Sequence, residues 1–221
     1  MVPFDPILAR AVERHGEAAV NNALPTVKSA EELAAVPDDR YLSLLCLRVF
    51  RAGLKHSLVD QKWPGFEAVF HGFDPAAVAA MTEEELEPLM GDTRLIRHWG
   101  KLKSVPANAA ALRAISAEAG GFGRWLASFP AERTLELWDA LSKRFTQLGG
   151  DSAPRFLRMA GRDTFVFSPS VEVALVEWGI TDGGKGKAAR AGAAAQFVEW
   201  RRTTGRPLAH LSMILAYSVP E

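Results

Sequence analysis

A Gly-Gly turn between two amphipathic segments is the part of this chain best suited to bind a ligand. Apolar residues recur at helical spacing before the turn, as at Leu141 and Phe145, and again after it. Gly149 and Gly150 can adopt backbone conformations with positive φ that other residues avoid. The first N–H groups of the helix that follows have no partner within that helix. Because such groups attract anions, residues 141–162 are expected to form a hairpin of two helices that binds phosphate.

The distribution of charge supports a nucleic-acid partner more than the total charge does. The chain has 26 basic and 26 acidic residues, and a net charge of zero argues against strong binding to nucleic acid. Residues 141–221, however, hold eleven Lys or Arg against seven Asp or Glu, and residues 93–117 hold five basic residues and no acidic one. A neutral protein can present such a local positive face to phosphates. The alternative is that each patch is an ordinary solvated helix surface.

Composition limits the class of protein. The spacing of Ala, Leu, Glu and Arg is helical along most of the chain, and alternating β-branched runs are scarce, so the sequence predicts an all-α fold. A chain of 221 residues can bury a sizeable core, and we expect a single helical domain over residues 1–221. The single cysteine, Cys46, excludes an internal disulfide and a cysteine-rich zinc site. Since neither a signal-like N-terminus nor an apolar run of membrane length occurs, we expect a soluble cytoplasmic protein.

Helices must position these groups, and several of their starts are marked in the sequence. Ser29 and Thr82 each precede a glutamate by three residues, which is the capping-box pattern. Asp74-Pro75 and Ser168-Pro169 each combine a capping residue with a proline suited to the first helical turn. A helix from Tyr41 to about Leu54, opened by two aspartates, is apolar on most sides and is therefore expected to be central. Further helices are expected over residues 5–24, 94–119, 122–129, 132–147, 187–203 and 207–217.

A second signature runs through residues 41–112. It consists of LCLRVFRAGL at 45–54, FEAVFHGFDPAAVAAMTEEELEPLM at 66–90 and LIRHWGKLKSVPANAAAL at 95–112. Together with LSKRFTQLGG at 141–150, these segments resemble the 3-methyladenine DNA glycosylase I family over roughly residues 41–160. The resemblance implies a two-lobed helical fold of the helix-hairpin-helix glycosylase type, with the helix-hairpin-helix at about 141–162. It also implies base excision repair, in which an alkylated purine of the 3-methyladenine type is flipped out of duplex DNA and its N-glycosidic bond is hydrolysed.

Such an enzyme needs a grip on the DNA backbone. The expected grip consists of the backbone N–H groups of Gly149, Gly150 and Ser152, with charge added by Lys143 and Arg144. These contacts carry no sequence information. We expect the partner to be double-stranded DNA with a damaged base. We expect no membrane partner, and a monomeric protein that associates with the nucleoid.

The enzyme also needs a pocket for the extruded base, and the candidates are Arg48, His56, Trp63 and Trp99. A pocket for a cationic base is expected to be aromatic, because a π face attracts a cation, although each ring can equally be part of the core. The family has a base-recognising glutamate at the position of Arg48 and an aromatic residue near that of His56. A guanidinium repels a cationic base that a carboxylate would attract. A histidine can stack on a base, but it adds a titratable group.

Two other features of the family do not carry over to this chain. The family's zinc site joins Cys and His residues near both chain ends, whereas Cys46 lies in mid-helix, so we expect no structural zinc and no cofactor. The wider group of helix-hairpin-helix glycosylases places a catalytic Asp where this chain has Ser168. Ser168 is better explained as a helix cap and the nearby Asp163 as a turn residue, so the catalytic residue is unknown. A positively charged alkylated base leaves readily, and its release needs less help from a carboxylate.

Four functions are compatible with these patterns. The first, which we expect, is a glycosylase for alkylated purines. The second is a DNA-binding relative without catalysis, and the third is a glycosylase for a different lesion, whose electron-rich edge Arg48 would recognise. The fourth is a helical protein-interaction domain, which the length of the resemblance disfavours. The first remains compatible with an ordinary pocket if Arg48 points to solvent or pairs with Asp39 or Asp60.

Overall fold

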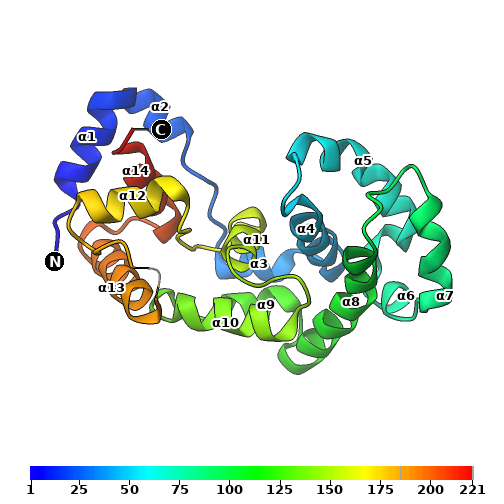
Figure 1. The fold of residues 1–221 in the computed structure, drawn as a ribbon. Helices are drawn as coiled ribbons and strands as arrows, with labels where there is room; N and C mark the ends of the chain where they lie inside the picture. Colours follow the sequence, from blue (N-terminus) through cyan, green and yellow to red (C-terminus); the bar gives the residue numbers. More distant parts are fainter. Residues whose placement is uncertain (185, 221) are drawn as a thin grey trace. The chain divides into compact units, whose positions relative to one another are not determined.

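The computed structural model describes residues 1–184 and 186–220, and every regular element in these ranges is a helix (Figure 1). This confirms the all-α prediction. The helices are α1 (Asp5–His15), α2 (Glu17–Asn22), α3 (Ala30–Ala35), α4 (Asp38–Arg51), α5 (His56–Val69), α6 (Pro75–Ala79), α7 (Glu83–Leu86), α8 (Trp99–Ala119), α9 (Phe122–Ala127), α10 (Thr134–Arg144), α11 (Ser152–Ala160), α12 (Pro169–Glu177), α13 (Lys187–Thr204) and α14 (Leu208–Tyr217). Three short 3-10 turns are η1 (His71–Phe73), η2 (Glu87–Gly91) and η3 (Ala131–Arg133).

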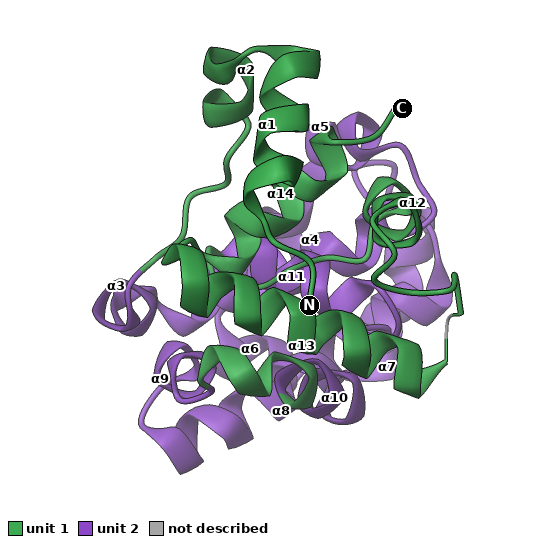
Figure 2. Ribbon diagram, turned by 90° about the vertical axis from the view of Figure 1, so that its left-hand side faces the viewer, with its two compact units in different colours: residues 1–28, 130–136, 161–221 green, residues 29–129, 137–160 purple. Residues whose placement is uncertain are grey.

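The chain forms two compact units (Figure 2). Unit 1 contains residues 1–28, residues 130–136 and the described residues from 161 onward; unit 2 contains residues 29–129 and 137–160. Each unit has its own core, and the chain passes between them more than once. None of the described helices is long and apolar enough to cross a membrane.

Unit 2 is organised around α4, as its apolar sequence predicts. Leu42, Leu45 and Phe50 are fully buried, and α4 packs against α8 and α11. The helix begins at Asp38 and ends at Arg51, about three residues before both expected ends. Pro37 occupies the N-cap position, so the two aspartates lie in the first turn, where negative charge favours the helix dipole. The Asp38 carboxylate instead accepts the backbone N–H of Phe122 at the start of α9, at 3.1 Å.

The segment 66–90 carries much of the family resemblance, and its phenylalanines have a structural role. Phe66, Phe70 and Phe73 are fully buried. The backbone at His71, Gly72 and Phe73 has positive φ throughout, a left-handed turn that costs free energy at non-glycine residues. Burial of the phenylalanines holds this turn in place. The motif therefore specifies a packed corner between α5 and α6.

The predicted caps at Ser29, Thr82, Asp74 and Ser168 are confirmed, because capping depends on residues only two or three positions apart. The predicted cap of α4 by Asp38 and Asp39 is wrong, since Pro37 holds that position. Ser29 and Thr82 form complete capping boxes, and Asp74 and Ser168 accept N–H groups at the starts of α6 and α12. The helix expected over residues 5–24 is instead divided into α1 and α2. Gly16, with φ of +81°, ends the first and precedes the second.

Unit 1 has an aromatic core between its helices. The rings of Phe165 and Phe197 stack with centroids 4.7 Å apart, and Trp200 meets Phe197 edge-on at 5.2 Å. The Trp200 indole N–H donates to the carbonyl of Val2 at 2.7 Å, which fixes the start of the chain on α13. Helix α14 packs against α1, α12 and α13, and Figure 1 shows these helices gathered around it.

Candidate nucleic-acid interface

The predicted hairpin is present between α10 and α11. Helix α10 ends at Arg144, three residues earlier than expected, and residues 145–151 form the turn. Positive φ occurs at Gln147 (+65°) and Gly150 (+57°) rather than at both glycines. A Cβ atom at either Gly149 or Gly150 would meet nothing within 4 Å. The outer side of the turn is therefore open to a large ligand.

The hairpin offers two of the three expected N–H groups to such a ligand. Gly149 and Gly150 are exposed, and within the described part of the chain neither N–H donates a hydrogen bond. The Ser152 N–H, by contrast, donates to the carbonyl of Gly149 at 3.1 Å. This N–H is therefore already used within the turn, unlike those of Gly149 and Gly150. What Ser152 still offers is its side-chain hydroxyl.

Asn108 holds the hairpin in place from α8. Its side chain is fully buried; its Oδ1 accepts the Thr146 N–H at 2.8 Å, and its Nδ2 donates to the Thr146 carbonyl at 3.1 Å. Leu148 is also fully buried, and its carbonyl accepts the Ser142 hydroxyl at 3.4 Å. These contacts fix the buried side of the turn while the two glycines remain exposed, which is the preorganisation a binding loop requires.

Lys143 and Arg144 are exposed and carry ion pairs at the end of α10. Lys143 pairs with Asp139 and Arg144 with Glu118, each at 3.0 Å. Exposed pairs of this kind contribute only about 0.2–1 kcal/mol. Either cation can therefore exchange its carboxylate for a DNA phosphate at little cost.

Arg48 is turned toward the hairpin and away from solvent. Arg48 is only 8% exposed, and its Nη2 lies 3.5 Å from the hydroxyl of Ser152, the first residue of α11. The arrangements with Asp39 or Asp60 do not occur, since Asp39 pairs with Arg40 and Asp60 with Arg51. A guanidinium has five N–H donors, and the guanidinium of Arg48 is buried with few hydrogen-bond acceptors near it.

The electrostatic surroundings of Arg48 are mainly positive. Burial lowers the pKa of the guanidinium, and the nearby charges of Arg155 and Arg51 lower it further, while the carboxylate of Asp151 opposes them. Lys101 is a second buried cation in this region. Burial, followed by the charge of Arg48, lowers the pKa of the Lys101 ammonium.

The aromatic pocket candidates differ in how available they are. Trp63 is half-buried and held by its neighbours, since it stacks on Phe66 at 4.8 Å and on Phe73 at 5.4 Å, and its indole N–H donates to Ser43. Trp99 is half-buried at the start of α8, with the Lys103 ammonium 5.5 Å from its ring centroid. A cation is thus already near its π face. His56 is exposed at the start of α5.

Sequence reasoning assigned no role to two residues that support this region, Lys101 and Asn108. The Lys101 ammonium donates to the carbonyls of Phe50 and Ala52 at 3.3 and 2.6 Å, so it satisfies the C-terminal end of α4. Both residues lie in the segment 95–112 that supported the family resemblance. That segment was the available signal, but its partners lie on other helices and are not visible in the sequence.

Two exposed leucines were also missed. Leu54, in the loop after α4, is 37% exposed, and Leu58, in the first turns of α5, is 44% exposed. Large apolar side chains at this exposure are uncommon among the described residues of unit 2, where Met90 is the other example. They are of the size that DNA-distorting proteins insert between base steps.

Ser168 and Asp163, the two residues near the position of the catalytic carboxylate in related glycosylases, both have structural roles here. Ser168 caps α12, as expected. Asp163 is buried; one of its oxygens accepts from Arg201 at 2.7 Å, and the other accepts the Ala209 N–H at the start of α14, at 2.9 Å. Both of its oxygens hold unit 1 together, and the position of a catalytic carboxylate stays unassigned.

The residues present do not fit the family's zinc site. Cys46 is buried in the middle of α4, and burial raises the pKa of its thiol, which opposes the thiolate form that binds zinc. Among the described residues, no three His, Cys, Asp or Glu side chains are grouped so that they would hold a metal ion.

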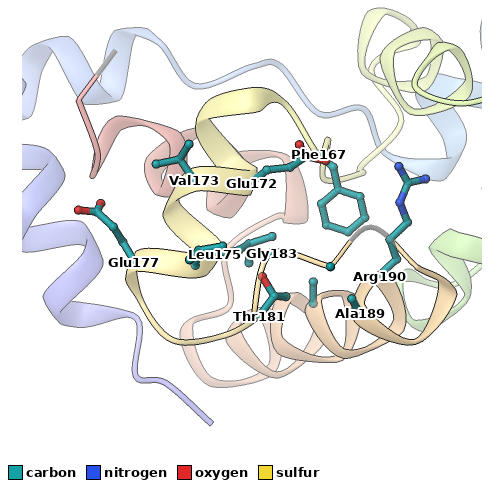
Figure 3. Close-up of a pocket in the computed structure, with 12 residues that line it drawn as sticks. Phe167, Glu172, Val173, Leu175, Glu177, Thr181, Gly183, Ala189 and Arg190 are labelled. Carbon is teal, nitrogen blue, oxygen red and sulfur yellow. The ribbon is translucent and has the colours of Figure 1, made fainter.

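Unit 1 contains an apolar cavity of about 370 Å³. Helix α12 lines it with Val173 and Leu175, and α13 lines it with Ala189 and Arg190 (Figure 3). The Arg190 guanidinium lies 5.8 Å from the centroid of the Phe167 ring. None of the residues predicted to contact DNA or the base lines this cavity.

Comparison with known proteins identifies the family. The methyladenine glycosylase family matches residues 17–148. The chain belongs to this family. The match begins ahead of Tyr41, where the resemblance was expected to start, and it ends within the hairpin. DNA-3-methyladenine glycosylase 1 of Escherichia coli (strain K12) is 42% identical over 72 residues, which are 33% of this chain and 38% of that enzyme. The alignment thus spans less than half of that relative.

Solved structures confirm the fold prediction. A crystal structure of 3-methyladenine DNA glycosylase I matches with a TM-score of 0.52 at 26% identity, over 72% of this chain and 90% of that one. The 8-oxoguanine glycosylase/lyase of Methanocaldococcus jannaschii, solved with a 15mer DNA containing 8-oxoguanine, matches 96% of this chain and 94% of its own, with a TM-score of 0.55. At 12% identity, this second likeness concerns the fold alone. The helical fold of that structure therefore matches nearly the whole chain.

Proposed function

We propose that this protein is a DNA glycosylase that removes alkylated purines of the 3-methyladenine type from duplex DNA. Membership of the methyladenine glycosylase family supports the reaction class. The observation that carries the proposal is the α10–α11 hairpin, in which Gly149 and Gly150 are exposed residues whose N–H groups donate no hydrogen bond within the described part of the chain. An N–H pair of this kind binds a phosphate without reading sequence, as an enzyme that scans DNA requires.

A buried base must leave the helix before its glycosidic bond can be cut, which costs a few kcal/mol of stacking and pairing. The exposed side chains of Leu54 and Leu58 are suited to fill the space that the base leaves. His56, two residues from each of these leucines in sequence, is exposed and able to stack on a flipped base. Trp99 is the second aromatic candidate. We give Trp63 a packing role because both of its stacking partners, Phe66 and Phe73, are fully buried.

The chemistry is hydrolysis of the bond between the sugar C1′ and the base nitrogen. The bonding electrons leave with the base, water adds at C1′, and the proton that water loses passes to solvent. A 3-methylpurine is positively charged while it is attached and neutral once released, so it is a good leaving group. The enzyme's principal task is then to extrude and position the base, which matches a chain without an assigned catalytic carboxylate.

Base release under single-turnover conditions tests the proposal. The substrate is methylated duplex DNA, and the products 3-methyladenine and 7-methylguanine are resolved from each other. The proposal predicts release of 3-methyladenine. Binding to the same duplex without any base release would favour the non-catalytic relative instead.

A glycosylase for a neutral lesion is the second candidate, and Arg48 is the observation that favours it. If its guanidinium contacts the base, it selects a carbonyl or ring nitrogen over a cation. Release of a neutral damaged base, with none of 3-methyladenine, would support this candidate.

A further inference from the structure

The buried guanidinium of Arg48 lacks the acceptors that its position requires. Its Nε is buried without a hydrogen-bond partner, and the contact of its Nη2 with the Ser152 hydroxyl, at 3.5 Å, is at the limit for a hydrogen bond. A buried cation without paired acceptors costs free energy that the fold must supply. Sites that tolerate this cost are frequently sites where a ligand provides the missing acceptor.

The groups around Arg48 point to an anion as that ligand. Arg155 on α11, Arg51 on α4 and Lys101 on α8 all contribute positive charge there, while the carboxylate of Asp151 opposes it and that of Asp60 is paired with Arg51. Lys101 already has carbonyl partners, and Arg51 has Asp60. Asp151 forms no ion pair among the described residues and remains exposed. The local excess of charge is therefore positive and is concentrated where α4 meets α11.

The second feature of this place is the N-terminus of α11. This helix has nine residues, its first residue is Ser152, and its dipole directs partial positive charge at an incoming anion. We propose that Arg48, from α4, and the N-terminal end of α11 together receive one phosphate of the DNA backbone. The proposal rests on the proposed function and extends the hairpin's grip to a residue of a different helix.

A phosphate suits this place better than a base edge does. Its oxygens accept from a guanidinium in a bidentate arrangement and from a serine hydroxyl at the same time. A bound phosphate also neutralises Arg48. The guanidinium then does not repel a cationic lesion elsewhere in the enzyme, so Arg48 becomes compatible with release of 3-methyladenine.

The test is binding of the full-length protein to a duplex that carries a tetrahydrofuran abasic analogue, which removes the base from the measurement. Arg48→Met is expected to weaken binding about tenfold to a hundredfold, as loss of a charge-assisted contact does. The slope of log K against log salt is expected to become less negative by about 0.9, which corresponds to the loss of one phosphate contact. The melting temperature of the free protein is expected to stay the same or rise, because an unpaired buried charge is removed.

Two further variants serve as controls for this binding measurement. Arg48→Lys keeps the charge and is expected to retain the salt slope while losing part of the affinity. Arg202→Met removes an exposed arginine that pairs with Glu199 and is expected to bind DNA like the wild type. Equal affinities for Arg48→Met and the wild type would overturn the inference, as would equal losses for Arg48→Met and Arg202→Met.

Replacing single phosphates by uncharged methylphosphonates identifies the partner. A methylphosphonate at one position is expected to lower the affinity of the wild type to that of Arg48→Met. The affinity of Arg48→Met is expected to be the same with and without the methylphosphonate at that position. If the loss of affinity caused by Arg48→Met is the same for every methylphosphonate duplex, the side chain has another role. The inference then fails, although the proposed function survives. If the wild type binds no duplex at all, both fail.

Discussion

Replacing Asn108 by alanine is expected to loosen the hairpin from the inside. The substitution removes both hydrogen bonds to the backbone of Thr146, at 2.8 and 3.1 Å. Each contributes about 1 kcal/mol net, so the free energy of unfolding should fall by about 2 kcal/mol. For a chain of this length, the melting temperature should fall by about 4–8 °C.

The same variant should bind DNA more weakly than its stability loss explains. A turn that is no longer fixed must be ordered on binding, and ordering one residue costs about 1–2 kcal/mol, or roughly tenfold in affinity. Thermal unfolding and binding to the abasic-analogue duplex, well below the melting temperature, measure the two effects separately. The matched control is Ser116→Ala on the same helix, since the buried Ser116 hydroxyl has no hydrogen-bond partner in the described structure.

Two results would refute this reasoning. If Asn108→Ala and Ser116→Ala have the same melting temperature, the two hydrogen bonds do not stabilise the protein. If Asn108→Ala is destabilised but binds DNA with unchanged affinity, the hairpin is not the grip that Asn108 positions.

Two other substitutions test the core and the surface. Burial, followed by the charge of Asp38, raises the pKa of Tyr41 to about 12, and its hydroxyl donates to the Leu33 carbonyl. The folded state therefore keeps this proton while the unfolded state loses it, so stability should fall between about pH 10 and 12, by about 1 kcal/mol at pH 11. Tyr41→Phe should remove that part of the pH dependence in denaturant unfolding; an unchanged profile would contradict it. Leu54→Ser should slow base release about tenfold, whereas Met90→Ser, at similar exposure, should not. Equal rates for the two variants would argue against a role for Leu54 in base extrusion.

Local features of this fold were predictable from the sequence because they depend on near neighbours. The capping boxes at Ser29 and Thr82 each involve residues three positions apart, and both form as expected. The hairpin followed in the same way from apolar spacing and a Gly-Gly pair. The φ values within it did not, because Gln147 takes a positive φ that its side chain disfavours.

The surroundings of the site were not predictable, because they depend on packing between distant segments. Arg48 meets Ser152 across 104 positions of sequence, and Asn108 meets Thr146 across 38. The sequence pattern marks both Arg48 and the segment containing Asn108, but it does not place either against the hairpin. Asp163 was expected as a turn residue; its burial against α14 depends on the fold of unit 1 as a whole.

The most direct measurement of the central claim is single-turnover release of 3-methyladenine from methylated duplex DNA by the wild type, Gly150→Asp and Gly150→Asn. Asp and Asn both tolerate the positive φ of this position, and a Cβ there meets nothing, so the pair differs in charge alone. The account predicts release by the wild type, near-complete loss with Gly150→Asp because its carboxylate repels the phosphate, and substantial retention with Gly150→Asn. Absence of release by the wild type, or equal rates for the two variants, would contradict it.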